Sequence, residues 1–246
     1  MSASYHATVA ISPFFVASGL PLLALWLHIR THLHEFAGVG TAPSTANTTM
    51  ATEYDHAAVE ASLEFVHTLC NRKETDLALL LQWLAGLIHR PESKKGNAIV
   101  LIGPSGCGKT TFACLTRLLL GDAKMITTST PHCNIWGNFN QAMRDALLVH
   151  IEEWRPHPCD AMKFNMCIQD PYIVIRAQSV HALTVPSYHR WLLTSNVPIA
   201  PEHSCRLQEI VCSGEHVGDQ AYFNQLHAVL AQPNAISSFA TCLASH

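Results

Sequence analysis

The sequence predicts an α/β fold in which a mainly parallel sheet is flanked by helices and preceded by a small helical segment. Between residues 57 and 90, apolar side chains recur at intervals of three and four positions, which is typical of helices. After Asn97, short apolar runs alternate with helical patterns. Strands that alternate with helices favour a parallel sheet whose two faces are both covered.

The composition limits the classes of function. The 246 residues are 48% apolar, which is enough for one sizeable core. Only 13% are charged and the net charge is −3, which excludes a global basic field that would attract nucleic acid. Nucleic-acid contacts would therefore need a few local cations or a ring of subunits. The nine cysteines have no zinc-type spacing and favour reduced thiols in a reducing compartment: the cytoplasm, the nucleus or a virus-associated setting.

The first part of the chain, residues 1–37, is an apolar leader. Its segment 8–29 carries no Asp, Glu, Lys or Arg and is long enough to cross a bilayer as a membrane anchor. Arg30 would then favour a cytoplasmic C-terminal side. Against an anchor, Pro13 and Pro21 interrupt the run, and the missing positive n-region makes it a poor signal peptide. A buried or disordered leader stays as the alternative.

The remaining chain divides into four parts by composition and periodicity. These are a flexible linker at 38–55, a helical lead-in at 56–96, a core domain at 97–235 and a tail at 236–246. The elements expected in the core domain are strands at 98–103, 123–129, 147–153 and 190–196, helices at 109–122, 137–146 and 219–232, and a hairpin made by 172–178 and 181–186.

The first expected strand leads into a phosphate-binding loop, since residues 99–112 read IVLIGPSGCGKTTF. Its glycines let the backbone curl so that N–H groups and the N-terminus of the next helix surround a polyphosphate. Lys109 can reach the β- and γ-phosphates, and the Thr110 hydroxyl can bind Mg²⁺. The sequence thus predicts ATP and Mg²⁺ as cofactors. The expected nucleotide-binding residues are Gly103, Pro104, Ser105, Gly106, Cys107, Gly108, Lys109, Thr110 and Thr111.

A second strand, in LLVHIEEW, ends in two carboxylates. Glu152 can hold Mg²⁺ directly or through water, and Glu153 can orient and deprotonate an attacking water. An enzyme that transfers phosphate to a substrate must avoid activating water, so this pair favours hydrolysis. His150, in the same strand, is expected to be a core histidine.

A third strand, in RWLLTSNVP, delivers Ser195 and Asn196 to the carboxyl edge of the sheet. Ligands bind at that edge in open α/β folds. An amide there can contact the γ-phosphate and the lytic water together, so we expect Asn196 to sense hydrolysis.

The order of these parts resembles superfamily 3 helicase domains, which are ring-forming AAA+ P-loop ATPases. The similarity is greatest to the phage/poxvirus-type primase-helicase group and covers residues 77–231. It includes the stretches MKFNMCIQDPYIVIRAQ and SCRLQEIVCSGEHVGDQAYFNQLHAVL but no primase domain. The resemblance implies a P-loop NTPase core of AAA+-like type and makes 97–235 a helicase-type ATPase domain.

The resemblance also implies residue roles. Lys109, Glu153 and Asn196 match catalytic positions, and Thr110 and Glu152 match the Mg²⁺ positions. Arg206 matches an arginine finger that reaches a neighbour's γ-phosphate. The hairpin from Tyr172 to Pro186 matches the element that enters the ring's pore. There Arg176 and His181 would contact nucleic acid, and Lys163, just upstream, is a further candidate for such a contact. Here the hairpin tip has arginine and histidine in place of lysine, and Arg206 lacks a second basic neighbour.

These observations lead to a main hypothesis and two alternatives. The main one is an ATP-driven helicase that forms a homo-hexamer and moves its hairpins along single-stranded DNA or RNA. It would act with a separate primase or polymerase in the replication of viral, phage or mobile-element DNA. The alternatives are a P-loop phosphotransferase for a small substrate and a non-unwinding nucleotide-binding remnant of a viral helicase. The phosphotransferase hypothesis does not explain the paired glutamates, the TSN strand or Arg206.

Overall fold

The computed structural model describes residues 54–246 except 95, 156–157 and 200–205. The described residues all belong to one compact unit, Met50–His246. The predicted leader, its candidate membrane segment and nearly all of the linker therefore lie outside the described residues. Within the described part, no helix is both long and apolar enough to cross a membrane.

The centre of this unit is a five-stranded sheet with the order β2-β3-β6-β1-β7, and every pair of neighbouring strands is parallel. The strands are β1 (Ala98–Ile102), β2 (Met125–Thr128), β3 (Leu148–Ile151), β6 (Arg190–Ser195) and β7 (Leu207–Val211). β1 lies between β6 and β7, with Ile102 paired to Ser195 on one side and to Val211 on the other. The segments that follow these three strands therefore leave the sheet at one edge.

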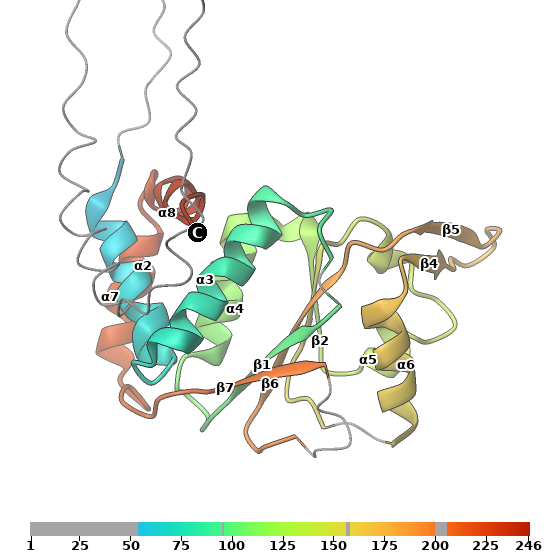
Figure 1. The fold of residues 1–246 in the computed structure, drawn as a ribbon, viewed down its shortest axis with the longest axis horizontal. Helices are drawn as coiled ribbons and strands as arrows, with labels where there is room; N and C mark the ends of the chain where they lie inside the picture. The colour runs from blue at the N-terminus through green and yellow to red at the C-terminus, as the bar shows by residue number, and fades with distance from the viewer. Residues whose placement is uncertain (1–53, 95, 156–157, 200–205) are drawn as a thin grey trace, which may run out of the picture. The chain divides into compact units, whose positions relative to one another are not determined.

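Helices cover both faces of the sheet, which confirms the predicted fold class (Figure 1). Alternate residues of β1 point to opposite faces, as the strand period requires. Ile99 and Leu101 pack in a core with one group of helices: α2 (His56–Leu69), α3 (Glu74–His89), α4 (Lys109–Leu120), α7 (Gln220–Leu230) and α8 (Ala235–Leu243). Val100 and Ile102 pack in a second core with α6 (Pro158–Gln169) and the hairpin.

The second core contains an aromatic row and supports the predicted hairpin. Phe164 of α6 lies between Trp154 and Trp191, with ring centroids 5.3 Å apart in each pair. The hairpin strands are β4 (Tyr172–Ile175) and β5 (Leu183–Pro186), which pair antiparallel, as predicted. Between α4 and β3 the chain also forms the short helices η2 (Asp122–Lys124), α5 (Pro131–Asn134) and η3 (Gln141–Arg144).

Several elements differ from the sequence expectation, and two of them, α5 and α6, are helices that were not expected. The helix expected at 137–146 is only the single turn η3, because Asn140 turns to the hairpin: its side chain donates to Val174 O and accepts from Arg176 N. β7 was not expected as a strand, since it is short and buries only Ile210 fully. The span expected as a tail at 236–246 is occupied mainly by α8, which packs against α2. At the start of α2, Asp55 N donates to the hydroxyl of Ser238 in α8 at 2.8 Å.

Candidate nucleotide-binding site

The predicted phosphate loop, the acidic turn and the asparagine strand meet in one pocket at the carboxyl edge of the sheet. Its volume is about 360 Å³, within the range of about 300–1,000 Å³ that is usual for small-molecule sites. The residues that line it are Ser105, Gly106, Gly108, Lys109, Thr110, Thr111, Ser129, Glu152, Glu153, Thr194, Asn196 and Phe223. The pocket therefore combines a cation, two carboxylates, hydroxyls and an amide.

The loop adopts a backbone that its glycines permit. Gly106 and Gly108 have φ angles of 80° and 106°, in the left-handed region where a side chain is strained. At Gly108 a Cβ atom would also lie 3.1 Å from the Phe65 ring and 3.4 Å from the Phe223 ring. Gly108 caps α4 with no side-chain hydrogen bond, so N–H groups of the first turn remain available for an anion.

Lys109 lies inside the loop and is only 8% exposed. Its Nζ donates to Gly103 O at 2.6 Å, to Pro104 O at 2.8 Å and to the Asn196 side-chain oxygen at 3.0 Å. A buried ammonium needs such partners, because its desolvation is costly. Phosphate oxygens entering the pocket could replace these acceptors.

The acidic turn is held between two strands. Glu152 N donates to Thr128 O at 2.9 Å, and Trp154 N donates to Thr194 O at 2.8 Å. Glu153 has a φ of 49°, a conformation that is uncommon for a residue other than glycine and that occurs often at functional sites. The turn presents both carboxylates to the pocket, with Glu153 the more exposed of the two.

Serine and asparagine at the end of β6 have different surroundings. The Ser195 hydroxyl is buried and donates to Val197 O at 2.6 Å, so it stabilises the turn after the strand. Asn196 is exposed, lines the pocket and accepts a hydrogen bond from Lys109.

Thr110 and Glu152, the predicted Mg²⁺ ligands, line the same pocket. Among the described residues there is no cluster of three or more His, Cys, Asp or Glu side chains suited to a metal.

Three lining residues were not among the predicted site residues. Ser129 follows β2 and Thr194 precedes Ser195, so the strand-end argument applied to the glutamates would have found both. Phe223 belongs to α7, and nothing in its local sequence indicates that this helix returns to the loop.

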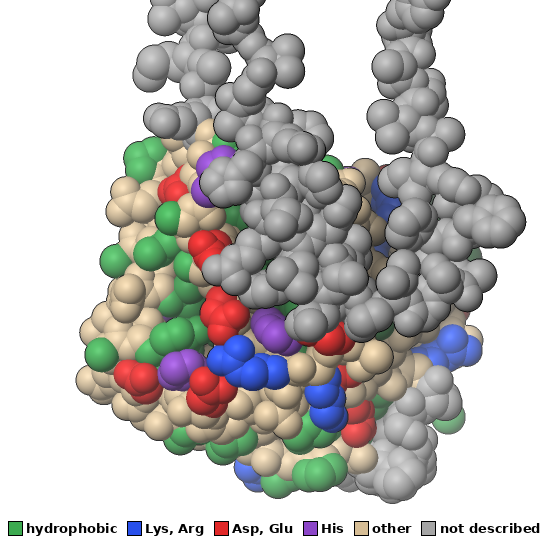
Figure 2. Space-filling model, turned by 60° about the vertical axis from the view of Figure 1, so that its left-hand side comes forward, with side chains coloured by type: hydrophobic (Ala, Val, Ile, Leu, Met, Phe, Trp, Pro, Cys, Tyr) green, Lys and Arg blue, Asp and Glu red, His purple; other side chains and the backbone are tan. Residues whose placement is uncertain are grey.

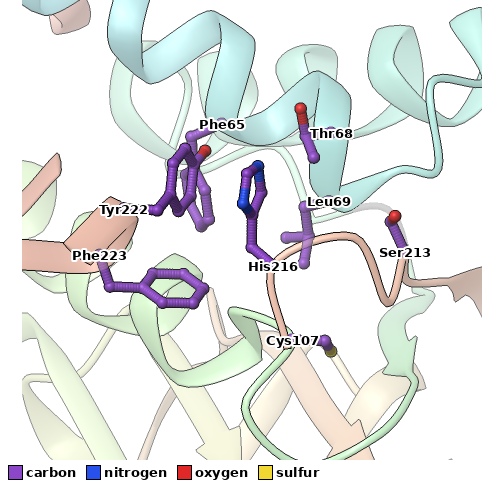
Figure 3. A pocket seen from close by; sticks show the side chains of 8 residues that line it. All are labelled: Phe65, Thr68, Leu69, Cys107, Ser213, His216, Tyr222 and Phe223. Atoms are coloured by element: carbon purple, nitrogen blue, oxygen red, sulfur yellow. The ribbon is translucent and has the colours of Figure 1, made fainter. Parts of the chain in front are cut away.

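Phe223 also borders an aromatic cluster formed with Phe65, His216 and Tyr222 (Figure 3). The His216 and Tyr222 rings are stacked, with centroids 3.6 Å apart and planes inclined by 2°. The cavity among these rings has a volume of only about 10 Å³, room for about one water. The cluster is therefore closely packed, and it fixes α7 against α2 and the loop.

Arg206 lies outside the pocket of its own chain. It precedes β7, and its carbonyl accepts from Ala98 N at 2.9 Å, at the amino edge of the sheet. Its Nη1 donates to Gly96 O at 3.4 Å. The structure thus places Arg206 at the edge opposite to Lys109, Glu153 and Asn196.

The predicted nucleic-acid contacts also lie away from the pocket. Arg176 and His181 are exposed in the loop between β4 and β5, and Lys163 is exposed on α6. Exposed apolar side chains share these elements, among them Met162 at 71% exposed and Val180 at 67%. The surface around the three cations is therefore mixed, with both apolar and basic groups.

Lys94 was not singled out by the sequence, yet it connects α6 to the base of the hairpin. Its Nζ donates to Cys167 O at 2.9 Å, Asp170 O at 2.8 Å and the Ser187 hydroxyl at 2.8 Å. Burial lowers the pKa of Lys94, while Asp170 opposes this shift. A cation bound to the last carbonyls of a helix also interacts favourably with the helix dipole.

The visible surface carries mixed charge. On the face shown in Figure 2, Asp and Glu side chains lie next to Lys, Arg and His side chains. Arg72 pairs with Glu64 at 2.9 Å and Glu215 at 3.2 Å. This interspersed charge agrees with the small net charge of the sequence.

Comparisons with known proteins show the fold. The model of a family described as "Family of unknown function (DUF5906)" matches residues 101–206. Curated proteins gave no match. Among solved structures, two apo structures of the NrS-1 C-terminal region are similar, with TM-scores of 0.62 and 0.61 and identities of 18% and 19%. Both alignments cover 82% of this chain, and this chain spans about half the length of those structures (50% and 49%). The chain therefore shares an α/β fold with them.

Proposed function

We propose that this chain is a Mg²⁺-dependent ATPase of the superfamily 3 helicase type. The observation that carries the proposal is the meeting of Lys109, Glu152, Glu153 and Asn196 in one pocket beside a glycine-rich loop and a helix N-terminus. A loop alone would support nucleotide binding. The two carboxylates and the amide add what hydrolysis needs, a base for water and a group that senses the γ-phosphate.

In this proposal the residues of the pocket have distinct tasks. The loop N–H groups and Lys109 hold the β- and γ-phosphates. Thr110 and Glu152 hold Mg²⁺, which supplies charge neutralisation when bound. Glu153 accepts a proton from the attacking water. Asn196 releases Lys109 to the phosphate and takes a position beside the water.

The position of Arg206 supports action between subunits. It lies at the opposite edge of the sheet from its own pocket, so a finger role would require the pocket of another chain. An arginine finger supplied by a neighbour is worth about 10³–10⁵ in rate in other P-loop enzymes. We therefore propose a homo-hexameric ring in which each pocket is completed by the next subunit.

The hairpin supports single-stranded nucleic acid as the partner. Arg176 and His181 are exposed at its tip, and six hairpins in a ring would line one channel with cations. We propose single-stranded DNA as the track and replication of viral, phage or mobile-element DNA as the setting, with a separate primase or polymerase.

The test combines turnover with assembly. ATP hydrolysis is measured across a range of protein concentrations, with and without a single-stranded oligonucleotide, and particle mass is measured by mass photometry in the same buffers. The proposal predicts that turnover per subunit rises with both variables and that a six-subunit particle forms. Binding without turnover would favour the nucleotide-binding remnant. Turnover that is independent of both variables would contradict the ring motor.

A further inference from the structure

Two cysteines meet beside Gly103, where β1 and β7 leave the sheet together. Cys212 follows β7, and its N–H donates to Ile102 O at 2.7 Å. A Cβ atom at Gly103 would lie 2.9 Å from Cys212 Cβ and 3.2 Å from Cys107 Sγ. Only a glycine leaves the two side chains room at this point. Both side chains therefore lie beside the same backbone position, and each thiol influences the pKa of the other. The Cys212 sulfhydryl also donates to Ile210 O at 3.9 Å.

The surroundings of the pair make the two thiols unequal. Cys212 and the nearby ammonium of Lys109 hold the pKa of Cys107 below its usual value, although burial opposes this shift. Lys109 Nζ lies 3.7 Å from the Cys107 sulfur. The neighbouring Cys107 and burial raise the pKa of Cys212. Since the thiolate is the reactive form, Cys107 is the more nucleophilic of the two, and Cys212 is the nearby thiol that can react with it after oxidation.

We propose that Cys107 and Cys212 form an oxidation site at which a hydroperoxide converts the two thiols to a disulfide inside the phosphate loop. The Cys107 thiolate attacks one peroxide oxygen, the O–O bond breaks, and the leaving hydroxide takes a proton to form water. The resulting sulfenic acid is attacked by the Cys212 sulfur, and its oxygen leaves as a second water with the Cys212 proton. In total, two thiols and one hydrogen peroxide give one disulfide and two waters.

The disulfide would connect the phosphate loop to the end of β7. The loop backbone at Cys107 could then no longer move independently of the sheet, and Lys109 would be retained on its present acceptors, Gly103 O and Pro104 O. This regulatory consequence rests on the proposed nucleotide binding, whereas the disulfide itself does not. Oxidation should lower nucleotide affinity at least about tenfold, the equivalent of about one charge-assisted hydrogen bond.

The experiment uses the full chain, purified under reducing conditions and treated with hydrogen peroxide. Remaining thiols are alkylated, and the protein is cleaved with trypsin and a glutamate-specific protease. Cys107 then lies in peptide 96–109 and Cys212 in peptide 210–215, each with one cysteine. The expected result is a cross-link between these two peptides that dithiothreitol reverses, together with weaker binding of a fluorescent ATP analogue by the oxidised protein.

Two variants serve as controls. Cys212→Ser should lose the cross-link and keep its nucleotide affinity after peroxide treatment and removal of the excess peroxide by catalase. Cys114→Ser, which changes an exposed cysteine of α4, should behave as the wild type. A cross-link to another cysteine, or none in the folded wild type, would overturn the proposal. Unchanged affinity in the cross-linked protein would overturn the regulatory part. If the reduced wild type binds no nucleotide, the proposed function fails while the cross-link still decides the oxidation site.

Discussion

The ammonium of Lys109 lies 3.0 Å from the side-chain oxygen of Asn196, although the two residues are 87 positions apart in the sequence. This contact joins the phosphate loop to the end of β6. It also gives the lysine an acceptor that a phosphate can replace. The amide is therefore placed to respond when the γ-phosphate arrives or leaves.

Asn196→Asp should weaken nucleotide binding more than Asn196→Ala. A carboxylate would form an ion pair with Lys109 and would repel the phosphates, whereas alanine removes one acceptor. We expect Asn196→Ala to lower turnover about 10- to 100-fold, the range for one hydrogen bond to a charged group. Titration and steady-state turnover measure both effects, with Asn224→Ala on the exposed side of α7 as the control. Tighter binding by the aspartate variant would refute this role.

Glu153→Gln should bind ATP with nearly unchanged affinity and lose about 10²–10⁴ in turnover, because glutamine cannot accept the proton of the attacking water. Glu209→Gln removes the same charge from an exposed position on β7, outside the pocket, and should keep full activity. Single-turnover measurements separate binding from chemistry. Undiminished turnover in Glu153→Gln would remove this residue from the proposed mechanism.

Arg206→Ala and Lys109→Ala should each be nearly inactive alone and should regain activity when mixed. In a mixed ring, an intact pocket of an Arg206→Ala subunit can lie next to the intact arginine of a Lys109→Ala subunit. Recovery should be greatest near equal amounts of the two variants. No recovery in particles that mass photometry shows to be mixed would argue against a finger supplied by a neighbour.

His150 should make the fold less stable in mild acid. Burial, with a smaller effect from Arg117, lowers the pKa of this core histidine from 6.5 to about 4. Between these values the unfolded chain binds a proton that the folded chain does not, so the free energy of unfolding falls as pH decreases, by up to about 1.4 kcal/mol per pH unit from this residue. Urea unfolding of His150→Leu should show a shallower pH slope than wild type, and His227→Leu, at an exposed site, should not. Equal slopes for all three proteins would contradict this expectation.

Lys94→Met should loosen the base of the hairpin. The variant keeps the length of the side chain and loses the hydrogen bonds to two carbonyls and a hydroxyl. We expect up to about 1–3 kcal/mol of lost stability, because two partly buried acceptors, Cys167 O and the Ser187 hydroxyl, lose their donor. Lys73→Met, at an exposed position, is the matched control for urea unfolding. An unchanged unfolding midpoint in Lys94→Met would show that these bonds contribute nothing.

The sequence was informative wherever a strand ended in polar residues. The parallel sheet and the hairpin are confirmed, and the structure brings Lys109, Glu152 and Asn196 together because parallel strands share one carboxyl edge. Phe223 and Lys94 could not be predicted in their roles, since each depends on where a distant helix packs. β7 and α8 were missed for different reasons: the strand is short with mixed polarity, and the helix follows an apparent end of the domain.

The nucleotide site is tested most directly by titrating the full chain and Lys109→Ala with a fluorescent ATP analogue and Mg²⁺. We expect saturable binding by the wild type and at least about tenfold weaker binding by the variant, because the variant lacks the one ammonium in the loop. Equal binding by the two proteins would show that the pocket formed by the loop, the acidic turn and Asn196 is not the nucleotide site.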